Sequence, residues 1–356
     1  NMSTTSIKAI DQQLEGVGII ERDDHGDVIM TWSHPTLQPA GVTQVAITRS
    51  HLEQNIASPL FSYSKFGVSW LYQLSIPNPK NTPSLARITA FCVTIVTKAF
   101  NPEKYGSLCK ILAETYSIAG SPVPVLQQWL TAVRGAALDN YDPLSFTKSA
   151  AMLATSIKDI IKLFDEQTIH IWSALLMKKR VVVYSDRLAH VLRVIRALPL
   201  FAFHRQDWDI LRPYVTLSDP EVAELKSAGV YVAGFTDANI KRRTDLWDVL
   251  VDIGEKKITI SEDIQDTIIE SAFHRDLLAF LTEAAADEET TAETIIAETM
   301  KKTKALLARL DSLKTVNEET GEGFISFEDL QERKLPAGLD RFLFVVASAE
   351  GMTKMY

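Results

Sequence analysis

The sequence has 356 residues, of which 46% are hydrophobic and 23% are charged. These proportions are ordinary for a soluble globular protein, and they exclude wholesale disorder, a collagen-like repeat and a small disulfide scaffold. The length exceeds what one hydrophobic core usually organises, so we expect two packed domains. The formal net charge of −8 argues against binding of nucleic acid or of an anionic membrane through bulk electrostatics.

The apolar segments are too short to cross a membrane. The longest run, Ala228–Phe235, contains 8 residues, whereas a transmembrane helix needs about 20. The first residues lack the order of charged, apolar and small residues that marks a secretion signal. The 2 cysteines, Cys92 and Cys109, cannot form a disulfide framework and lack the spacing of a metal site. We therefore expect a reduced, cytoplasmic protein without a transmembrane segment.

The motifs of bond-making enzymes are missing from the sequence. No glycine is followed by lysine, which excludes a phosphate-binding loop of the GxxxxGK[ST] type, and neither HExxH nor GxSxG occurs. The acidic segment Asp23–Asp27 has the composition of a calcium loop, but Val28, Ile29 and Met30 stand where further ligands would follow. A hairpin turn explains this segment better. We expect a binding protein that needs no metal and no cofactor.

The first part of the chain has the pattern of a small α/β domain. Apolar segments on both sides of Asp23–Asp27 predict a β-hairpin, and apolar residues at helical spacing follow Pro102, which suits the start of a helix. The predicted strands cover residues 16–21, 28–32, 69–75 and 88–96, and the predicted helices cover 102–116 and 125–133. Periodicity is lost between Gly135 and Pro143, so we place the first domain at residues 1–140.

The middle of the chain alternates between helical and strand patterns, which predicts a second α/β domain over residues 148–260. The predicted strands cover 181–184, 211–215, 230–235, 249–253 and 258–260, and the predicted helices cover 152–164, 169–176 and 186–197. Pro213 has no N–H to donate to a neighbouring strand, so we expect its strand at an edge of the sheet. Asp186 can cap the helix that follows the first strand.

The remaining residues, 261–356, have helical patterns and are predicted to form an all-helical part. One helix begins at Ser261 and extends to Leu281, a second covers Glu288–Leu310 and a third covers Asp340–Ala349. The second helix is acidic in its first turns and basic in its last turns, which suits the helix dipole. This charge order is therefore interpreted as structural.

Several segments of the sequence resemble the DENN domain family. They comprise an amphipathic helix, a basic turn leading into a buried strand, a segment around Trp208 and an aromatic-apolar-glycine segment, at Ser156–Ile161, Leu175–Tyr184, Gln206–Leu211 and Tyr231–Phe235. Segments similar to one branch of this family are Gly16–Glu21, Phe100–Tyr105, Gly120–Val123 and His204–Trp208. The similarity extends from about residue 15 to the last helix. Val230 differs, because many members of the family have proline before the tyrosine of the last segment.

The resemblance implies a mixed α/β (α+β) fold with an N-terminal longin-like module, a central α/β DENN core and an all-helical C-terminal part. It also implies action on Rab-family GTPases in endosomal traffic as a guanine-nucleotide exchange factor, a function that breaks no covalent bond. For the narrower branch it implies association with the coiled-coil subunits of the Commander endosomal recycling assembly. These partners would place the protein at the surface of late and recycling endosomes. A non-catalytic scaffold that binds the coiled-coil subunits is the alternative to an exchange factor.

The candidate partner-binding residues fall into four groups. The resemblance implies that the helix after the buried strand lies near the GTPase, although a solvated helix face with a capping residue is the simpler explanation. Charge and aromatic character suggest the remaining groups, against the alternatives of core packing or solvated loops. In chain order the candidates are Trp32 and His34 for a coiled-coil partner, Asp186, Arg187 and His190 for the GTPase, the cluster His204, Arg205 and Trp208, and the basic triplet Lys241, Arg242 and Arg243.

Overall fold

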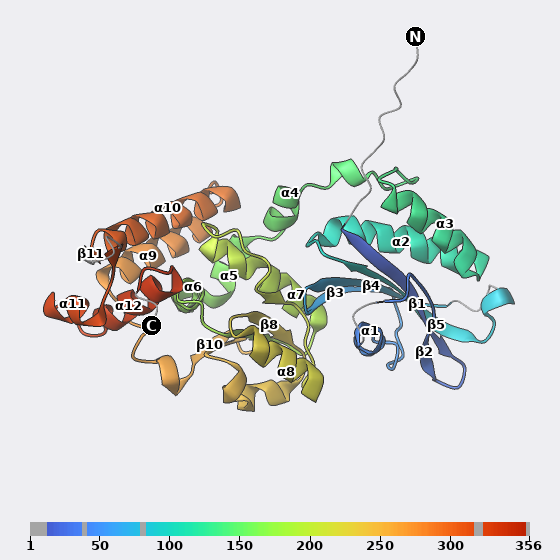
Figure 1. Cartoon of the computed structure of the whole chain (residues 1–356), viewed down its shortest axis with the longest axis horizontal. Helices are drawn as coiled ribbons and strands as arrows, with labels where there is room; N and C mark the ends of the chain where they lie inside the picture. Colours follow the sequence, from blue (N-terminus) through green and yellow to red (C-terminus); the bar gives the residue numbers. More distant parts are fainter. Residues whose placement is uncertain (1–12, 38–40, 79–82, 317–322, 354–356) are drawn as a thin grey trace, which may run out of the picture. The chain divides into compact units, whose positions relative to one another are not determined.

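The computed structural model describes residues 13–37, 41–78, 83–316 and 323–353. The chain forms two compact units, which divide between Ala154 and Thr155. Each unit contains a five-stranded sheet, and helices α9 to α12 follow the second sheet in the chain (Figure 1). The predicted fold class, a mixed α/β chain with a helical C-terminal region, is confirmed. The predicted boundary at residue 260 lies inside the second unit.

The first unit is an antiparallel sheet with helices on both faces. Its strands lie in the order β2-β1-β5-β4-β3, with α1 on one face and α2 and α3 on the other (Figure 1). The strands are β1 (Leu14–Asp23), β2 (Val28–His34), β3 (Leu60–Phe66), β4 (Ser69–Pro77) and β5 (Ile88–Thr97). The helices are α1 (Val42–Arg49), α2 (Pro102–Ala119), α3 (Pro122–Val133) and α4 (Lys148–Leu153), with 3-10 turns η1 (Pro83–Leu85) and η2 (Pro143–Ser145).

Alternation along the strands gives each face of this sheet its own core. Ile20 and Cys92 pack on one face together with Val42 of α1. On the other face Tyr72 of β4 packs against Tyr105 of α2, with ring centroids 4.8 Å apart. The sheet is thus buried on both faces, which explains why its strands carry apolar runs as well as alternating residues.

The predicted hairpin in this unit is confirmed. Strands β1 and β2 pair antiparallel, and Oδ1 of Asp23 accepts hydrogen bonds from the backbone N–H groups of His25 and Asp27, both at 2.9 Å. Helix α1 was not predicted, because five of its eight residues are β-branched and favour strands by propensity. Its buried residues Val42 and Val45 nevertheless follow helical spacing, and burial against the sheet decides the structure.

The second unit is built on a mostly parallel sheet. The strand order is β10-β9-β6-β8-β7, in which β10 alone pairs antiparallel with its neighbour. The strands are β6 (Val181–Tyr184), β7 (Leu211–Arg212), β8 (Val232–Phe235), β9 (Val249–Asp252) and β10 (Lys257–Ile260). The predicted edge position of the strand before Pro213 is confirmed, because β7 is the last strand of the sheet.

The helices of this unit precede, connect and follow the strands. They are α5 (Ile157–Phe164), α6 (Thr168–Leu176), α7 (Leu188–Ala197), α8 (Asp219–Ala228), α9 (Ala272–Ala286), α10 (Ala292–Asp311), α11 (Phe327–Glu332) and α12 (Leu339–Ala349). Shorter 3-10 segments are η3 (Asp165–Gln167), η4 (Leu198–Ala202), η5 (Ala238–Arg242), η6 (Thr244–Leu246) and η7 (Glu262–Ile264), and β11 (Thr315–Val316) pairs with β12 (Gly323–Phe324).

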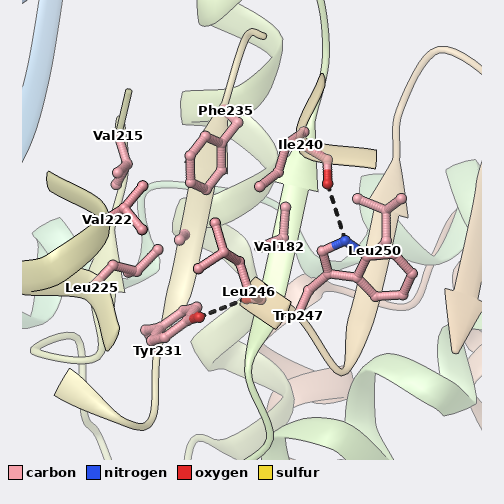
Figure 2. Packing of buried hydrophobic residues seen from close by; sticks show 11 residues of the cluster. Val182, Val215, Val222, Leu225, Tyr231, Phe235, Ile240, Leu246, Trp247 and Leu250 are labelled. Carbon is pink, nitrogen blue, oxygen red and sulfur yellow. Dashed lines mark hydrogen bonds between the residues drawn. The ribbon is translucent and has the colours of Figure 1, made fainter. Parts of the chain in front are cut away.

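One face of the parallel sheet packs against α8 and the 3-10 segments (Figure 2). Val182, Phe235 and Leu250 extend from three neighbouring strands into this core. Two buried polar groups in the core have partners, as burial requires. The Tyr231 hydroxyl donates to the carbonyl oxygen of Leu246 at 2.5 Å, and the Trp247 indole N–H donates to the carbonyl oxygen of Ile240 at 3.1 Å.

The helical C-terminal part packs onto α6 through Trp172. Its indole N–H donates to Oγ1 of Thr303 in α10 at 3.0 Å, and its ring lies 5.6 Å from that of Phe273 and 6.3 Å from that of Phe342, between centroids. One side chain therefore contacts residues of α9, α10 and α12. This core explains why residues 155–356 form one compact unit.

The predicted starts of α7 and α9 were wrong. Helix α7 begins at Leu188 with Arg187 as its N-cap and no side-chain cap. Asp186 therefore does not cap it. Residues after Ser261 form only the short segment η7, and α9 begins eleven residues later, after its N-cap Ser271. The helix predicted from Glu288 begins at Ala292, and the helix predicted over 152–164 is divided between α4 and α5. These errors arise because apolar spacing locates the body of a helix better than its ends.

Two histidines, the half-buried His170 and the buried His274, lie next to this helical core. Burial, together with the charge that the nearby His170 carries in acid, lowers the pKa of His274, which is only 2% exposed, to about 4. Burial also lowers the pKa of His170, while Glu270 opposes that shift. Both rings are therefore neutral at pH 7 in the folded protein.

These shifts predict a loss of stability in mild acid. Between pH 6.5 and about 4 the unfolded chain binds protons that the folded chain does not, so the free energy of unfolding falls as the pH falls. A pKa lowered from 6.5 to about 4 corresponds to about 3 kcal/mol over that interval. Urea titrations of His274→Gln should show a clearly smaller decrease than the unsubstituted chain. Equal decreases in both proteins would contradict this assignment.

Candidate partner-binding site

The carboxyl end of strand β6 is the place where an open α/β sheet usually binds its partner. The chain leaves β6 for β7 and β8 on one side and then crosses to β9 on the other side. The loops that follow β6 and β9 therefore separate at this point, and such a switch point is the general ligand-binding position of parallel sheets. Two candidate residues, Asp186 and Arg187, lie in the loop after β6.

Asp186 and Arg187 are both exposed. The hydroxyl of the buried Ser185 shapes their loop: it donates to Oδ1 of Asp186 and accepts from the backbone N–H of Arg187, both at 3.3 Å. Among the residues described by the structure, neither charged side chain forms an ion pair. An aspartate and an arginine on a fixed loop thus present opposite charges to solvent, as a charge-complementary interface requires.

His190 belongs to the first turn of α7, where its backbone N–H donates to the carbonyl oxygen of Arg187 at 3.0 Å. Its side chain is half-buried, and the ring makes no ion pair within the described ranges. The structure thus brings Asp186, Arg187 and His190 together in one loop and one helical turn. Their role in partner binding stays a prediction.

Two of the three residues of the basic triplet form ion pairs within the chain. Nζ of Lys241 lies 2.6 Å from Oδ2 of Asp252 and 4.5 Å from the centroid of the Tyr184 ring, and the ion pair raises the pKa of the lysine. Arg243 donates two hydrogen bonds to Asp245, at 2.8 and 2.9 Å, which raises the pKa of the guanidinium. Arg242 is the exposed member of the triplet, and within the described residues its side chain has no ion pair.

The cluster of His204, Arg205 and Trp208 has internal contacts. Trp208 is 3% exposed, and its indole N–H donates to the carbonyl oxygen of Arg196 at 3.3 Å. Arg205 donates to the last carbonyl groups of α6, at 2.7 Å each, and to the carboxylate of Glu350. His204 and Arg205 lower the pKa of Glu350 to about 2. These contacts give the cluster a structural role within the second unit.

Trp32 and His34 lie on strand β2 of the first unit. Both side chains are half-buried, and their rings stack with centroids 6.5 Å apart at an interplanar angle of 13°. Trp32 also lines a cavity of 530 Å³ together with Ile19, Thr31, Arg87, Tyr116 and Pro122. An aromatic ring at the wall of such a cavity on an edge strand can contact a partner side chain.

Comparisons with known proteins agree on one family. The chain is 43% identical to DENN domain-containing protein 10 of Dictyostelium discoideum, over 95% of this chain and 97% of that protein. It is 31% identical to the human protein of the same name, over 97% of this chain and 98% of the relative, and 32% identical to the zebrafish protein. The chain belongs to the DENN domain-containing protein 10 family. A family profile described as "SPA: Stabilization of polarity axis" matches residues 154–262.

The match to residues 154–262 covers the whole parallel sheet, including Asp186 and Arg187. Membership in the DENN domain-containing protein 10 family therefore rests on both units, and the profile rests on the unit that carries the candidate site. Across the described ranges, no group of three or more histidine, cysteine or acidic residues is arranged to hold a metal ion. None of the described helices combines the length and apolar character needed to cross a membrane.

Sequence reasoning missed three residues around the candidate positions. Tyr184 and Asp252 hold Lys241 at the carboxyl edge of the sheet, and Glu350 holds Arg205 from the far end of the chain. Asp252 is the last residue of an otherwise apolar strand, which is a signal that could have been used. Nothing in the sequence indicates that Glu350 lies near Arg205, because 145 residues separate them.

Proposed function

We propose that this member of the DENN domain-containing protein 10 family is a guanine-nucleotide exchange factor for Rab-family GTPases in endosomal membrane traffic. The family resemblance of the sequence motivates the substrate class. The observation that carries the proposal is the exposed pair Asp186 and Arg187, without internal ion pairs among the described residues, in the loop after the central parallel strand. An interface that contributes charge and shape without bond-making chemistry is what nucleotide exchange needs.

Nucleotide exchange follows from a difference between two binding free energies, those of the protein for the nucleotide-free and for the nucleotide-loaded GTPase. An exchange protein binds the nucleotide-free GTPase more tightly than the loaded form. By reciprocity, it must weaken nucleotide binding by the same ratio of affinities. Picomolar nucleotide binding corresponds to about 16 kcal/mol. An interface of standard size, about 1,600 Å², is needed to offset a substantial part of that free energy. In this proposal the magnesium ion and the nucleotide are bound by the GTPase.

Opposite charges on neighbouring residues give the proposed interface a defined polarity. Asp186 would meet a basic side chain of the GTPase, and Arg187 would meet an acidic side chain beside it. Reversing either charge would place like charges opposite each other, which costs more than simple truncation. The proposal therefore predicts a stronger effect for Asp186→Arg than for Asp186→Ala.

Release of fluorescent GDP from a panel of purified Rab GTPases tests the exchange proposal. We expect one or two members to release GDP about tenfold faster, which corresponds to about 1.4 kcal/mol in the barrier. Asp186→Arg and Arg187→Glu should each remove most of this acceleration. Lys257→Glu, at an exposed position of strand β10, is the control that should retain it. Equal rates with and without the protein for every GTPase would contradict exchange.

A second function, a scaffold that binds coiled-coil subunits of the Commander assembly, is favoured by one specific observation. Trp32 is only half-buried and borders a cavity of 530 Å³, which residues of α2 and α3 also line. Half-buried aromatic residues at a cavity wall are the usual anchors for a partner helix. Such binding would place the protein at the cytoplasmic surface of late and recycling endosomes through its partners.

The scaffold function predicts that Trp32→Asp weakens capture of purified coiled-coil subunits at least tenfold, because a carboxylate replaces an aromatic anchor. The matched control is Val68→Asp, since Val68 is 77% exposed at the turn between β3 and β4. Both variants should melt at the temperature of the unsubstituted chain. Undiminished capture by Trp32→Asp would overturn the role of this residue.

A further inference from the structure

A largely apolar pocket lies at the amino edge of the parallel sheet, opposite the loop that carries Asp186 and Arg187. It has a volume of 250 Å³ and lies between the end of α6, segment η4 and the start of β8. Its apolar lining includes Leu175, Pro199, Ala202, Ile210, Val230 and Val232. Val230 is 37% exposed, so the apolar surface continues from the pocket to its mouth.

Two lysines line the same pocket, Lys178 and Lys179. Within the described ranges neither forms an ion pair. Lys179 interacts electrostatically with the carboxylate of Asp248. Arg180, however, already donates hydrogen bonds to both oxygens of that carboxylate, at 2.7 and 2.8 Å. The two ammonium groups therefore remain available at the pocket.

The backbone at Lys178 is unusual for a lysine. Its φ is +51°, in the left-handed region that glycine adopts most easily. The position follows the end of α6, and the N–H of Lys179 donates to the carbonyl oxygen of Ala174 at 2.9 Å, as in the glycine-terminated ends of many helices. A lysine at this position costs backbone free energy that glycine would not, and the strained residue borders an apolar pocket.

The other charged residues of the pocket, Arg205 and Asp207, form hydrogen bonds within the chain. Arg205 binds Glu350 and two carbonyl groups of α6. Asp207 Oδ1 accepts a hydrogen bond from the backbone N–H of Asp209 at 2.8 Å. With Arg205 balanced by Glu350, the two lysines outnumber the single carboxylate of Asp207, so the pocket keeps an excess of positive charge on a chain whose net charge is −8.

We propose that this pocket binds an acidic linear segment of a partner protein, which inserts one large apolar side chain between α6 and β8. The two lysines would pair with acidic residues on either side of that side chain. The volume supports a peptide anchor, because 250 Å³ is below the range of about 300–1,000 Å³ typical of sites for drug-sized ligands. The inference does not depend on nucleotide exchange, since the pocket and the exchange candidates lie at opposite edges of the sheet.

Selection of peptides from a random phage-displayed library on the full chain tests this proposal. We expect the enriched peptides to share one tryptophan, phenylalanine or leucine with aspartate or glutamate on both sides. A fluorescein-labelled peptide of the enriched sequence should bind the variant Lys178→Glu/Lys179→Glu at least tenfold more weakly. Val230→Arg, which places a charge at the apolar mouth, should also weaken binding.

The chain contains a close control for the charge change. Lys256 and Lys257 are also adjacent, both are exposed, whereas Lys179 is half-buried, and Lys256 has a left-handed backbone like Lys178, with φ of +49°. The variant Lys256→Glu/Lys257→Glu has the same net charge as the pocket variant and should bind the peptide normally. Enrichment without an acidic-apolar motif, or equal weakening in both double variants, would overturn the proposal. Binding of dodecanoate at this pocket, with no peptide enriched from the library, would also overturn the proposal.

Discussion

Replacing Trp172 by alanine should lower the free energy of unfolding of the second unit by about 4 kcal/mol. The side chain is 1% exposed and contacts residues of α9, α10 and α12. Removal of a large buried aromatic ring typically costs about 3–5 kcal/mol, because the cavity closes only in part. Urea unfolding followed by circular dichroism measures the change.

Two milder substitutions separate packing from hydrogen bonding at this position. Trp172→Phe keeps most of the ring and should cost less than the alanine variant. Thr303→Val removes the acceptor of the indole N–H and should cost about 1–3 kcal/mol, since a buried donor then has no partner. A loss below about 1 kcal/mol for Trp172→Ala would contradict the view that residues 155–356 share one core.

Substitution of Gly234 by alanine should cost about 3 kcal/mol, although it adds a single methyl group. A Cβ at this position would lie 2.2 Å from the carbonyl oxygen of Pro213 and 2.5 Å from Cγ1 of Val191. Overpacking of a core typically costs about 1–3 kcal/mol, and the upper end applies here because a backbone atom must move. The same backbone segment pairs with β8, since the N–H of Val215 donates to the carbonyl oxygen of Gly234 at 2.9 Å.

Gly254→Ala is the control for this experiment. Its nearest neighbour would be Oδ1 of Asp252 at 3.6 Å, an ordinary contact, so its cost should stay within about 0.5 kcal/mol. Adding Val191→Ala to Gly234→Ala should restore little stability, because the clash with the Pro213 carbonyl remains. Full restoration by that second substitution would show that side-chain crowding, not the backbone, excludes alanine.

The sequence predicts the fold best where one local signal dominates. The Asp23–Asp27 turn and the apolar segments around it specify a hairpin, and Pro213 correctly placed its strand at the edge of the second sheet. Helix α1 was missed because its β-branched residues favour a strand locally, while burial against the sheet favours a helix. Helix α8 was not predicted either, and its packing against the parallel sheet stabilises it.

Only part of the candidate site could be predicted from the sequence. Asp186 and Arg187 could be named because they follow a recognisable buried strand. The ion pair between Lys241 and Asp252 could not, since it depends on how the ends of η5 and β9 meet in space. Trp208 has the residue type of an interface anchor, but the fold buries it, and burial of a single aromatic residue is not encoded in local spacing.

The affinity of the full chain for Rab GTPases in two nucleotide states tests the proposed function most directly. The affinity for the nucleotide-free form should exceed that for the GDP-bound form by at least about 100-fold, or about 2.7 kcal/mol, for any GTPase whose GDP release the protein accelerates. Charge reversal at Asp186 should reduce that ratio while leaving the melting temperature unchanged. Equal affinities for both states across the panel, or no binding to any GTPase, would contradict exchange and leave the coiled-coil scaffold as the function to pursue.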